Sequence, residues 1–242
     1  MKSIFSIVVL ILLSQNVVFA EGNYEDTRRI SQSNVNYRDL LYVYYKGTKT
    51  ELTDEILTNY INDFYEDDYK NHRQNEFEWP AVINKHRTEL TSKINEANLS
   101  TVYTFQTGAS FGTYNFEKEG FDVGIDMEYL FVARNGLSVE QGRVDTDLNS
   151  KAILIFVNDI NSYNFFKIER NKANALVNSR TSNGNVNRNI TLHISFTINN
   201  FFPDVGLFLI AQMNNSISAR ITKIDIYDGP NKIGELSSVP NS

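Results

Sequence analysis

The sequence predicts an α+β protein in which an N-terminal helical layer packs on a mostly antiparallel C-terminal β-sheet. Between residues 37 and 98, apolar residues recur at three- and four-residue steps, which is typical of amphipathic helices. From residue 101 onward the chain is instead rich in β-branched and aromatic residues, several of which alternate with polar ones. This change of period predicts a helical region over residues 37–99 and a mostly β region over residues 100–242.

The first 20 residues have the pattern of a secretory signal peptide. A short basic start precedes an apolar stretch over residues 4–13, and Ala20 is the kind of small residue at which signal peptidase cleaves. About ten apolar residues are too few for the ~20 that cross a bilayer, so we expect cleavage after Ala20 and no membrane span. The expected location is periplasmic or secreted. The polar residues 21–36 then form a loosely held leader.

Three helices are expected in the helical region, over residues 37–47, 52–65 and 79–98. Thr53 is a suitable N-cap for the second helix, and acidic residues follow in its first turn, where the helix dipole favours them. The third helix has proline in its first turn, which a helix tolerates. His86 lies between two basic residues of this helix, so we expect it at the surface.

Six strands are expected in the β region. They cover residues 102–106, 127–133, 152–157, 190–198, 206–211 and 217–227. The run over 152–157 is apolar without interruption, which predicts a central strand covered on both faces. A turn at residues 228–231 predicts a closing hairpin between residues 224–227 and 232–236. Residues 162–178 have helical spacing with Ser162 as a possible cap, and a strand over 173–177 is the alternative.

The segment GTYNFEKEGF, residues 112–121, resembles one found in uncharacterised, secreted bacterial proteins. Together with the strand pattern, the similarity extends over about residues 103–228. The resemblance implies a family without an assigned activity, so it assigns no functional residue, and it favours an exported bacterial protein. Tyr114, Phe116 and Phe121 in this segment are explained more simply as aromatic residues that pack in the sheet.

The charge distribution argues against nucleic acid as a partner. The formal net charge is −6, and loss of Lys2 with the signal peptide changes it to −7. Proteins that bind nucleic acid need clustered lysine and arginine, whereas the basic residues here are interleaved with acidic ones. The chain has no cysteine, so an exported form is held by its core and not by disulfides.

One motif suggests catalysis. Residues 108–112 spell G-x-S-x-G, in which a serine on a strand-to-helix turn acts as a nucleophile. Asp159 and His193 follow in the order of α/β-hydrolases, so Ser110 would be the nucleophile, His193 its base and Asp159 the residue that orients the base. The expected strand over 102–106 does precede the motif. However, the residues after Gly112 are aromatic and turn-like rather than helical, and the helical layer before the motif lacks the strands that would carry an oxyanion loop. A sharp bend after a strand is therefore the favoured interpretation.

Two spacings resemble metal sites. The sequence D-x-D-x-N at residues 145–149 opens like a calcium loop, but serine and phenylalanine replace the glycine and glutamate that such a loop requires. Asp68, His72 and Glu76 fall at four-residue steps, so they could share a helix face as a zinc or copper site, although no second histidine is near. A solvated turn and a solvated helix face explain them, so we predict no metal and no cofactor.

The favoured function is therefore an exported, non-catalytic binding or accessory protein of the bacterial envelope, whose partner is an unknown protein or a small ligand. Aromatic residues of the helical region are candidates for a ligand or partner face. They are Tyr42, Tyr44, Tyr45, Tyr60, Phe64, Tyr65, Tyr69, Phe77 and Trp79. Two alternatives remain: a serine hydrolase that uses Ser110, and a periplasmic inhibitor or immunity protein that neutralises a basic partner.

Overall fold

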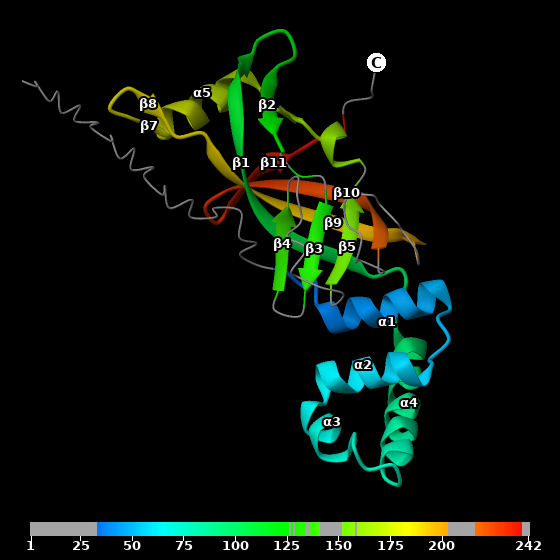
Figure 1. Ribbon diagram of the computed structural model, residues 1–242. Helices are drawn as coiled ribbons and strands as arrows, with labels where there is room; N and C mark the ends of the chain where they lie inside the picture. Colours follow the sequence, from blue (N-terminus) through cyan, green and yellow to red (C-terminus); the bar gives the residue numbers. More distant parts are fainter. Residues whose placement is uncertain are drawn as a thin grey trace, which may run out of the picture.

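The computed structural model describes residues 33–125, 127, 129–133, 136–140, 152–157, 159–202 and 216–238 (Figure 1). The predictions that fall outside these residues are the signal peptide, most of the polar leader, the strand over 206–211 and the calcium-loop-like turn over 145–149. Helices occupy the N-terminal part of the described chain, and a mostly antiparallel sheet follows. The predicted α+β fold is confirmed.

Four of the described helices form the N-terminal layer, and another follows within the β region. They are α1 (Tyr37–Thr48), α2 (Asp54–Phe64), α3 (Glu66–His72), α4 (Trp79–Glu96) and α5 (Arg170–Ser179). Thr53 caps α2 as predicted, because its hydroxyl accepts a hydrogen bond from the backbone N–H of Ile56. The predicted second helix ends earlier than expected, since the backbone leaves helical geometry at Tyr65 before α3 begins. No helix of the described residues is long and apolar enough to cross a membrane.

The described strands form one large sheet and a small hairpin. The strands of the large sheet are β1 (Val102–Asn115), β2 (Gly120–Gly124), β3 (Tyr129–Ala133), β4 (Gly136–Glu140), β5 (Ala152–Val157), β6 (Phe165–Lys167), β9 (Asn189–Phe202), β10 (Ser216–Asp228) and β11 (Asn231–Glu235). The hairpin pairs β7 (Thr181–Ser182) with β8 (Asn185–Val186). The order in the large sheet is β4-β3-β5-β10-β9-β1-β2-β6, with β11 paired to β10. Of the described pairs, only β5 and β10 run parallel.

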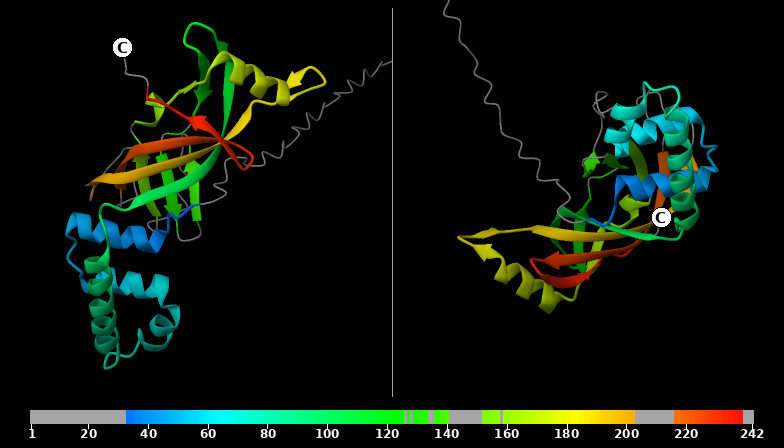
Figure 2. Two further views of the ribbon diagram at one scale, coloured as in Figure 1. Left: turned by 180° about the vertical axis from the view of Figure 1, so that it is seen from behind. Right: turned by 90° about the horizontal axis from the view of Figure 1, so that it is seen from below.

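The long strands β1 and β10 pair with different neighbouring strands along their lengths (Figure 2). The first part of β10 pairs with β5, and its last part pairs with β11. Similarly, β1 pairs with β9 along most of its length and with β2 only from Ser110 onward. After β11, the N–H of Ser237 donates to the carbonyl oxygen of Phe165 in β6 at 3.3 Å. The C-terminal hairpin thereby reaches the opposite edge, and the sheet curls.

The apolar strand predicted over 152–157 is β5, and its bounds are as predicted. However, β5 is not at the centre of the sheet. It lies inside the sheet between β3 and β10, whereas β10 and β9 form the middle. Ile153, Ile155 and Val157 are buried. The alternation predicted for β9 is confirmed, since its buried face includes Leu192, Ile194, Phe196 and Ile198. The closing hairpin of β10 and β11 is confirmed as well.

The helical layer reaches the sheet through α1, which lies against β9 and β5. In turn α4 packs on α1 and α2, so that α2, α3 and α4 extend away from the sheet (Figure 1). Gly47 of α1 lies directly against Phe201 of β9. A Cβ atom on Gly47 would stand 2.3 Å from a ring carbon of Phe201, which is closer than real Cβ atoms come.

The end of the leader is held more firmly than predicted. The N–H of Asn34 donates to the carbonyl oxygen of Thr104 at 3.2 Å, and its side-chain oxygen accepts from the N–H of Thr104 at 2.7 Å. Before Ser110, β1 pairs with β9 on one side only, so the backbone groups on its other edge have no strand partner. Ser33 and Asn34 satisfy them, and Asn36 then caps α1.

One local prediction was wrong, and another is confirmed only in part. The expected bend at residues 108–112 lies within β1, which continues through the motif to Asn115 with a register shift against β2 between Phe111 and Tyr114. Strand geometry prevails there because Ser110 is paired on both sides, with Asn189 in β9 and with Gly124 in β2. The expected helix over 162–178 is divided, since a 3₁₀ turn at 160–162 and the short strand β6 precede α5.

Candidate functional site

The structure does not bring Ser110 and His193 together. Both lie in strands that pair with each other, but His193 stands opposite Gln106, four residues before Ser110 along β1. At 3.2–3.4 Å per residue this separation is about 13 Å, far beyond a hydrogen bond. His193 instead stacks on Tyr227, with ring centroids 3.8 Å apart. Burial lowers the pKa of His193, an effect that the charge of Asp225 opposes.

Asp159 has a structural contact in this fold. Both of its carboxylate oxygens accept from the backbone N–H of Ile221 in β10, each at 3.2 Å. Ile221 lies between the part of β10 that pairs with β5 and the part that pairs with β11. Without Asp159, the backbone N–H of Ile221 would have no hydrogen-bond partner on the side of β10 that faces β5 and β11. The three residues of the possible triad therefore occupy three separate environments.

Ser110 does line a concave part of the surface, which we call the β1–β2 hollow. Its volume is about 440 Å³, and it is open to solvent. The residues that line it are Ser110, Phe111, Gly112, Asp122, Val123, Gly124 and Asn164. The hollow spans β1, β2 and the residue that precedes β6.

The polar side chains of the hollow are Ser110, Asp122 and Asn164. All three are exposed, and no hydrogen bond or ion pair joins their side chains to any other described residue. A hydroxyl, a carboxylate and a carboxamide are thus available to a ligand at one place. Sequence reasoning found Ser110 through the motif. It missed Asp122 and Asn164, which lie 42 residues apart in the sequence and meet only because β2 pairs with β6.

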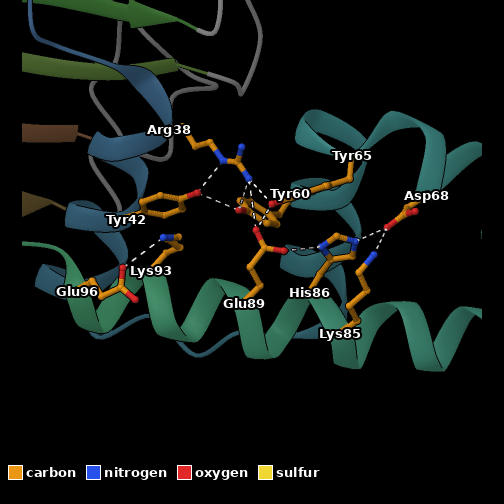
Figure 3. Close-up of polar contacts among 10 residues, drawn as sticks. All are labelled: Arg38, Tyr42, Tyr60, Tyr65, Asp68, Lys85, His86, Glu89, Lys93 and Glu96. Atoms are coloured by element: carbon orange, nitrogen blue, oxygen red, sulfur yellow. Dashed lines mark hydrogen bonds and ion pairs between the residues drawn. The ribbon is translucent and has the colours of Figure 1, made fainter.

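A second gathering of polar groups lies among the helices, around Arg38 of α1 (Figure 3). Nε of Arg38 donates to the hydroxyl of Tyr42 at 2.6 Å, and Nη2 donates to the hydroxyls of Tyr60, at 3.0 Å, and Tyr65. The Tyr65 hydroxyl in turn donates to the carboxylate of Glu89. The guanidinium also lies 4.9–5.7 Å from the ring centres of Tyr60, Phe64 and Tyr65.

These contacts change the acidity of the groups. Burial acts to lower the pKa of Arg38, but the hydrogen bond and charge attraction of the tyrosines outweigh it and raise the pKa above its usual value. Burial, followed by hydrogen bonds, raises the pKa of Tyr42 and of Tyr65 well above the ordinary 10.0. Arg38 therefore stays charged and the tyrosines stay neutral at neutral pH. The arrangement joins α1 to α2 and α4, which is a structural role.

His86 extends this polar network toward α3, and the prediction that it lies at the surface was wrong. Its side chain is 0% exposed. Nε2 lies 2.7 Å from the carboxylate of Asp68, and Nδ1 lies 3.5 Å from that of Glu89. The sequence held a signal for this burial, because His86 follows Ile83 by three residues and precedes Leu90 by four, and both are core residues. Hydrogen bonds from His86 and Lys85 lower the pKa of Asp68.

The residues of the possible zinc spacing have separate partners. Asp68 contacts His86 and Lys85, whereas His72 contacts Glu78 at 2.8 Å. Glu76 lies beyond the end of α3, so it does not continue the helical face. Within the described part of the chain, no group of three or more histidine or acidic residues is placed to hold a metal ion.

Most of the helical aromatic residues belong to the core. Tyr42, Tyr44 and Tyr60 are buried. The partly buried ones that pack against the core are Tyr45, Phe64, Tyr65, Tyr69 and Trp79. Phe77 differs, since 87% of it is exposed between Glu76 and Glu78.

The comparisons with known proteins give a family without an activity. Residues 53–179, slightly more than half of the 242 residues, match the family described as Domain of unknown function (DUF4852). The match runs from the N-cap of α2 to the end of α5, so it contains the whole β1–β2 hollow and excludes Arg38. It begins and ends earlier than the resemblance predicted over 103–228. No curated protein and no solved structure matches the chain. The chain belongs to the family Domain of unknown function (DUF4852), and the predicted resemblance to an uncharacterised family is confirmed.

Proposed function

We propose that this protein is an exported, non-catalytic binding protein of the bacterial envelope, and that the β1–β2 hollow is its binding site. One observation carries the proposal: Ser110, Asp122 and Asn164 converge on the hollow while no other described residue engages their side chains. Three free groups around one concave surface suit recognition of a ligand.

The arrangement of Ser110 favours binding over hydrolysis. A serine nucleophile needs a base within hydrogen-bond reach, and no described side chain makes a hydrogen bond with the hydroxyl of Ser110. His193 lies about 13 Å away along the strands, by the rise of 3.2–3.4 Å per residue. Asp159 is engaged with the backbone of β10. We therefore treat Ser110 as a hydrogen-bonding group of the hollow.

Labelling with a fluorophosphonate probe tests the proposal. The probe reacts with activated serines, so we expect no more labelling of the mature protein than of its Ser110→Ala variant. Labelling that disappears in Ser110→Ala would support the serine hydrolase alternative and contradict ours. The export part is tested separately by intact-mass analysis of exported protein, which should give a chain that begins at Glu21.

The alternative of an inhibitor or immunity protein is favoured by a different feature, the turn between α3 and α4. The side-chain oxygen of Asn75 accepts from the N–H of Phe77 at 3.1 Å and so fixes the turn that exposes this ring. Glu76 and Glu78 flank it, which suits a basic partner with an apolar pocket. Phe77→Ser should then abolish inhibition of such a partner. Phe116→Ser is the matched control, because Phe116 is 67% exposed at the distant β1–β2 turn.

A further inference from the structure

The floor of the β1–β2 hollow is made by strand positions without bulky side chains. Ser110 in β1 pairs with Gly124 in β2, and Gly112 lies two residues further along the same face of β1. A Cβ atom built on Gly124 meets nothing within 4 Å, and one on Gly112 meets only a backbone oxygen at 3.5 Å. Larger side chains would fit these positions sterically. The glycines therefore leave free space above the two strands.

Polar side chains border this free space from β1, β2 and the residue that precedes β6. Asp122 shares the exposed face of β2 with Gly124, while Phe121 and Val123 point into the core. Asn164 is held beside β2 because its carbonyl oxygen accepts from the N–H of Val123 at 2.8 Å. Its side chain stays free, like those of Ser110 and Asp122. The backbone of the hollow is thus held by strand pairing, and its three polar side chains are not engaged by any other described residue.

We infer that the β1–β2 hollow binds a small, neutral, polyhydroxylated molecule such as a monosaccharide unit, an inference that rests on the proposed binding function. A carboxylate only accepts hydrogen bonds, whereas a hydroxyl and a carboxamide both donate and accept. Asp122, Ser110 and Asn164 together therefore match neighbouring hydroxyl groups, each of which donates one hydrogen bond and accepts others. The volume of about 440 Å³ lies within the range of small-molecule sites.

Charge argues against an anionic ligand. No lysine or arginine lines the hollow, and Asp122 gives it a negative charge. The nearby Arg188 is engaged elsewhere, since Nη1 donates to the carbonyl oxygen of Gly112 and the guanidinium lies 5.4 Å from the ring centre of Phe111. An amine such as ethanolamine would use Asp122, but it offers Ser110 and Asn164 a single hydroxyl instead of the several neighbouring hydroxyls of a sugar.

Amide NMR titration of the ¹⁵N-labelled mature protein tests the inference. The probes are D-glucose, D-mannose, N-acetyl-D-glucosamine and glycerol, with ethanolamine and inorganic phosphate as charged comparisons. We expect one or more of the sugars to shift the amide signals of Gly112 and Gly124 and to saturate, with a Kd in about the millimolar range for a few hydrogen bonds in an open site. Ethanolamine and phosphate should not shift these signals.

Variants of the hollow test whether the sugars bind there. Gly124→Leu fills the free space without a steric conflict, so it should weaken sugar binding by about tenfold or more, and Asp122→Asn by about tenfold. Thr104→Leu, at an exposed position elsewhere on β1, is the matched control and should bind as the unmodified protein does. Saturable binding of ethanolamine alone, equal sugar binding by Gly124→Leu, or no sugar shifts at all would overturn the ligand class. Labelling of Ser110 by the fluorophosphonate probe would instead overturn the proposed non-catalytic function on which the inference rests, so the two failures are distinguishable.

Discussion

Gly47 of α1 and Phe201 of β9 approach so closely that a Cβ atom on the glycine would stand 2.3 Å from a carbon of the phenylalanine ring. Tyr44, one helical turn earlier, contacts the same ring at a centroid distance of 6.5 Å. Within the N-terminal layer, α1 lies against the sheet and α4 packs on α1. The contact between Gly47 and Phe201 therefore helps to hold the whole layer on the sheet.

Gly47→Ala should therefore destabilise the protein, although alanine is the better helix residue by about 1 kcal/mol. The added methyl group forces the Phe201 ring to move, and overpacking of this kind costs roughly 1–3 kcal/mol. Urea unfolding measures the difference, and Gly124→Ala is the control because its Cβ has free space. A more stable Gly47→Ala protein would mean that the contact is loose. Adding Phe201→Ala should remove most of the penalty.

Asp159→Ala should lower the free energy of unfolding by about 1–3 kcal/mol, because the N–H of Ile221 loses its acceptor in a partly buried place. Asp159→Asn keeps one acceptor oxygen and should lose less. Chemical unfolding of both variants gives the comparison. If Asp159→Ala is as stable as the unmodified protein, the carboxylate does not support β10.

The tyrosines around Arg38 predict a loss of stability at alkaline pH. In the folded protein the pKa values of Tyr42 and Tyr65 lie well above 10.0, their value in an unfolded chain. Below pH 10 both states hold these protons, so the contribution is fully present. Above pH 10 the unfolded state loses its protons first, and the free energy of unfolding falls as the pH rises toward the folded pKa values.

Denaturant unfolding at a series of pH values from 8 to about 11 measures this slope. The double variant Tyr42→Phe with Tyr65→Phe should be less stable at pH 8 and should show a shallower decline above pH 10. If the free energy of unfolding falls with pH equally steeply in the double variant, the pKa values of these two hydroxyls do not change on folding.

Asp68 predicts a second pH dependence, at the acidic end. Hydrogen bonds from His86 and Lys85 hold its pKa below the ordinary 3.8, so the contribution of Asp68 is present above that pH. It is lost as the pH falls through the lower, folded pKa, because the carboxylate then takes up a proton. Asp68→Asn should be less stable at neutral pH and should lose less stability on acidification. Identical acid unfolding curves for both proteins would contradict the role of this carboxylate.

Local sequence patterns were sufficient for much of the fold. The alternation of Leu192, Ile194 and Phe196 placed one face of β9 in the core, and Thr53 marked the start of α2. Both signals depend on side chains a few residues apart. The place of β5 could not be predicted, because its parallel partner β10 begins about 60 residues later and nothing local encodes that pairing.

The candidate site was predictable only in part, for the same reason. Ser110 belongs to a short motif, but its neighbours in the hollow come from the pairing of β1, β2 and β6. His86 shows a different limit. Its flanking charges, Lys85 and Arg87, suggested the surface, yet the apolar spacing of Ile83 and Leu90 decided which face of α4 it occupies.

Ester hydrolysis is the most direct test of the central claim that the protein binds without catalysis. Purified mature protein and its Ser110→Ala variant would be assayed with a panel of p-nitrophenyl esters. Loss of a true triad nucleophile reduces turnover on the order of 10⁶-fold in a serine protease, so the two possibilities are far apart. We predict no hydrolysis above buffer for either protein. Hydrolysis by the unmodified protein that Ser110→Ala abolishes would contradict the claim and make Ser110 a nucleophile.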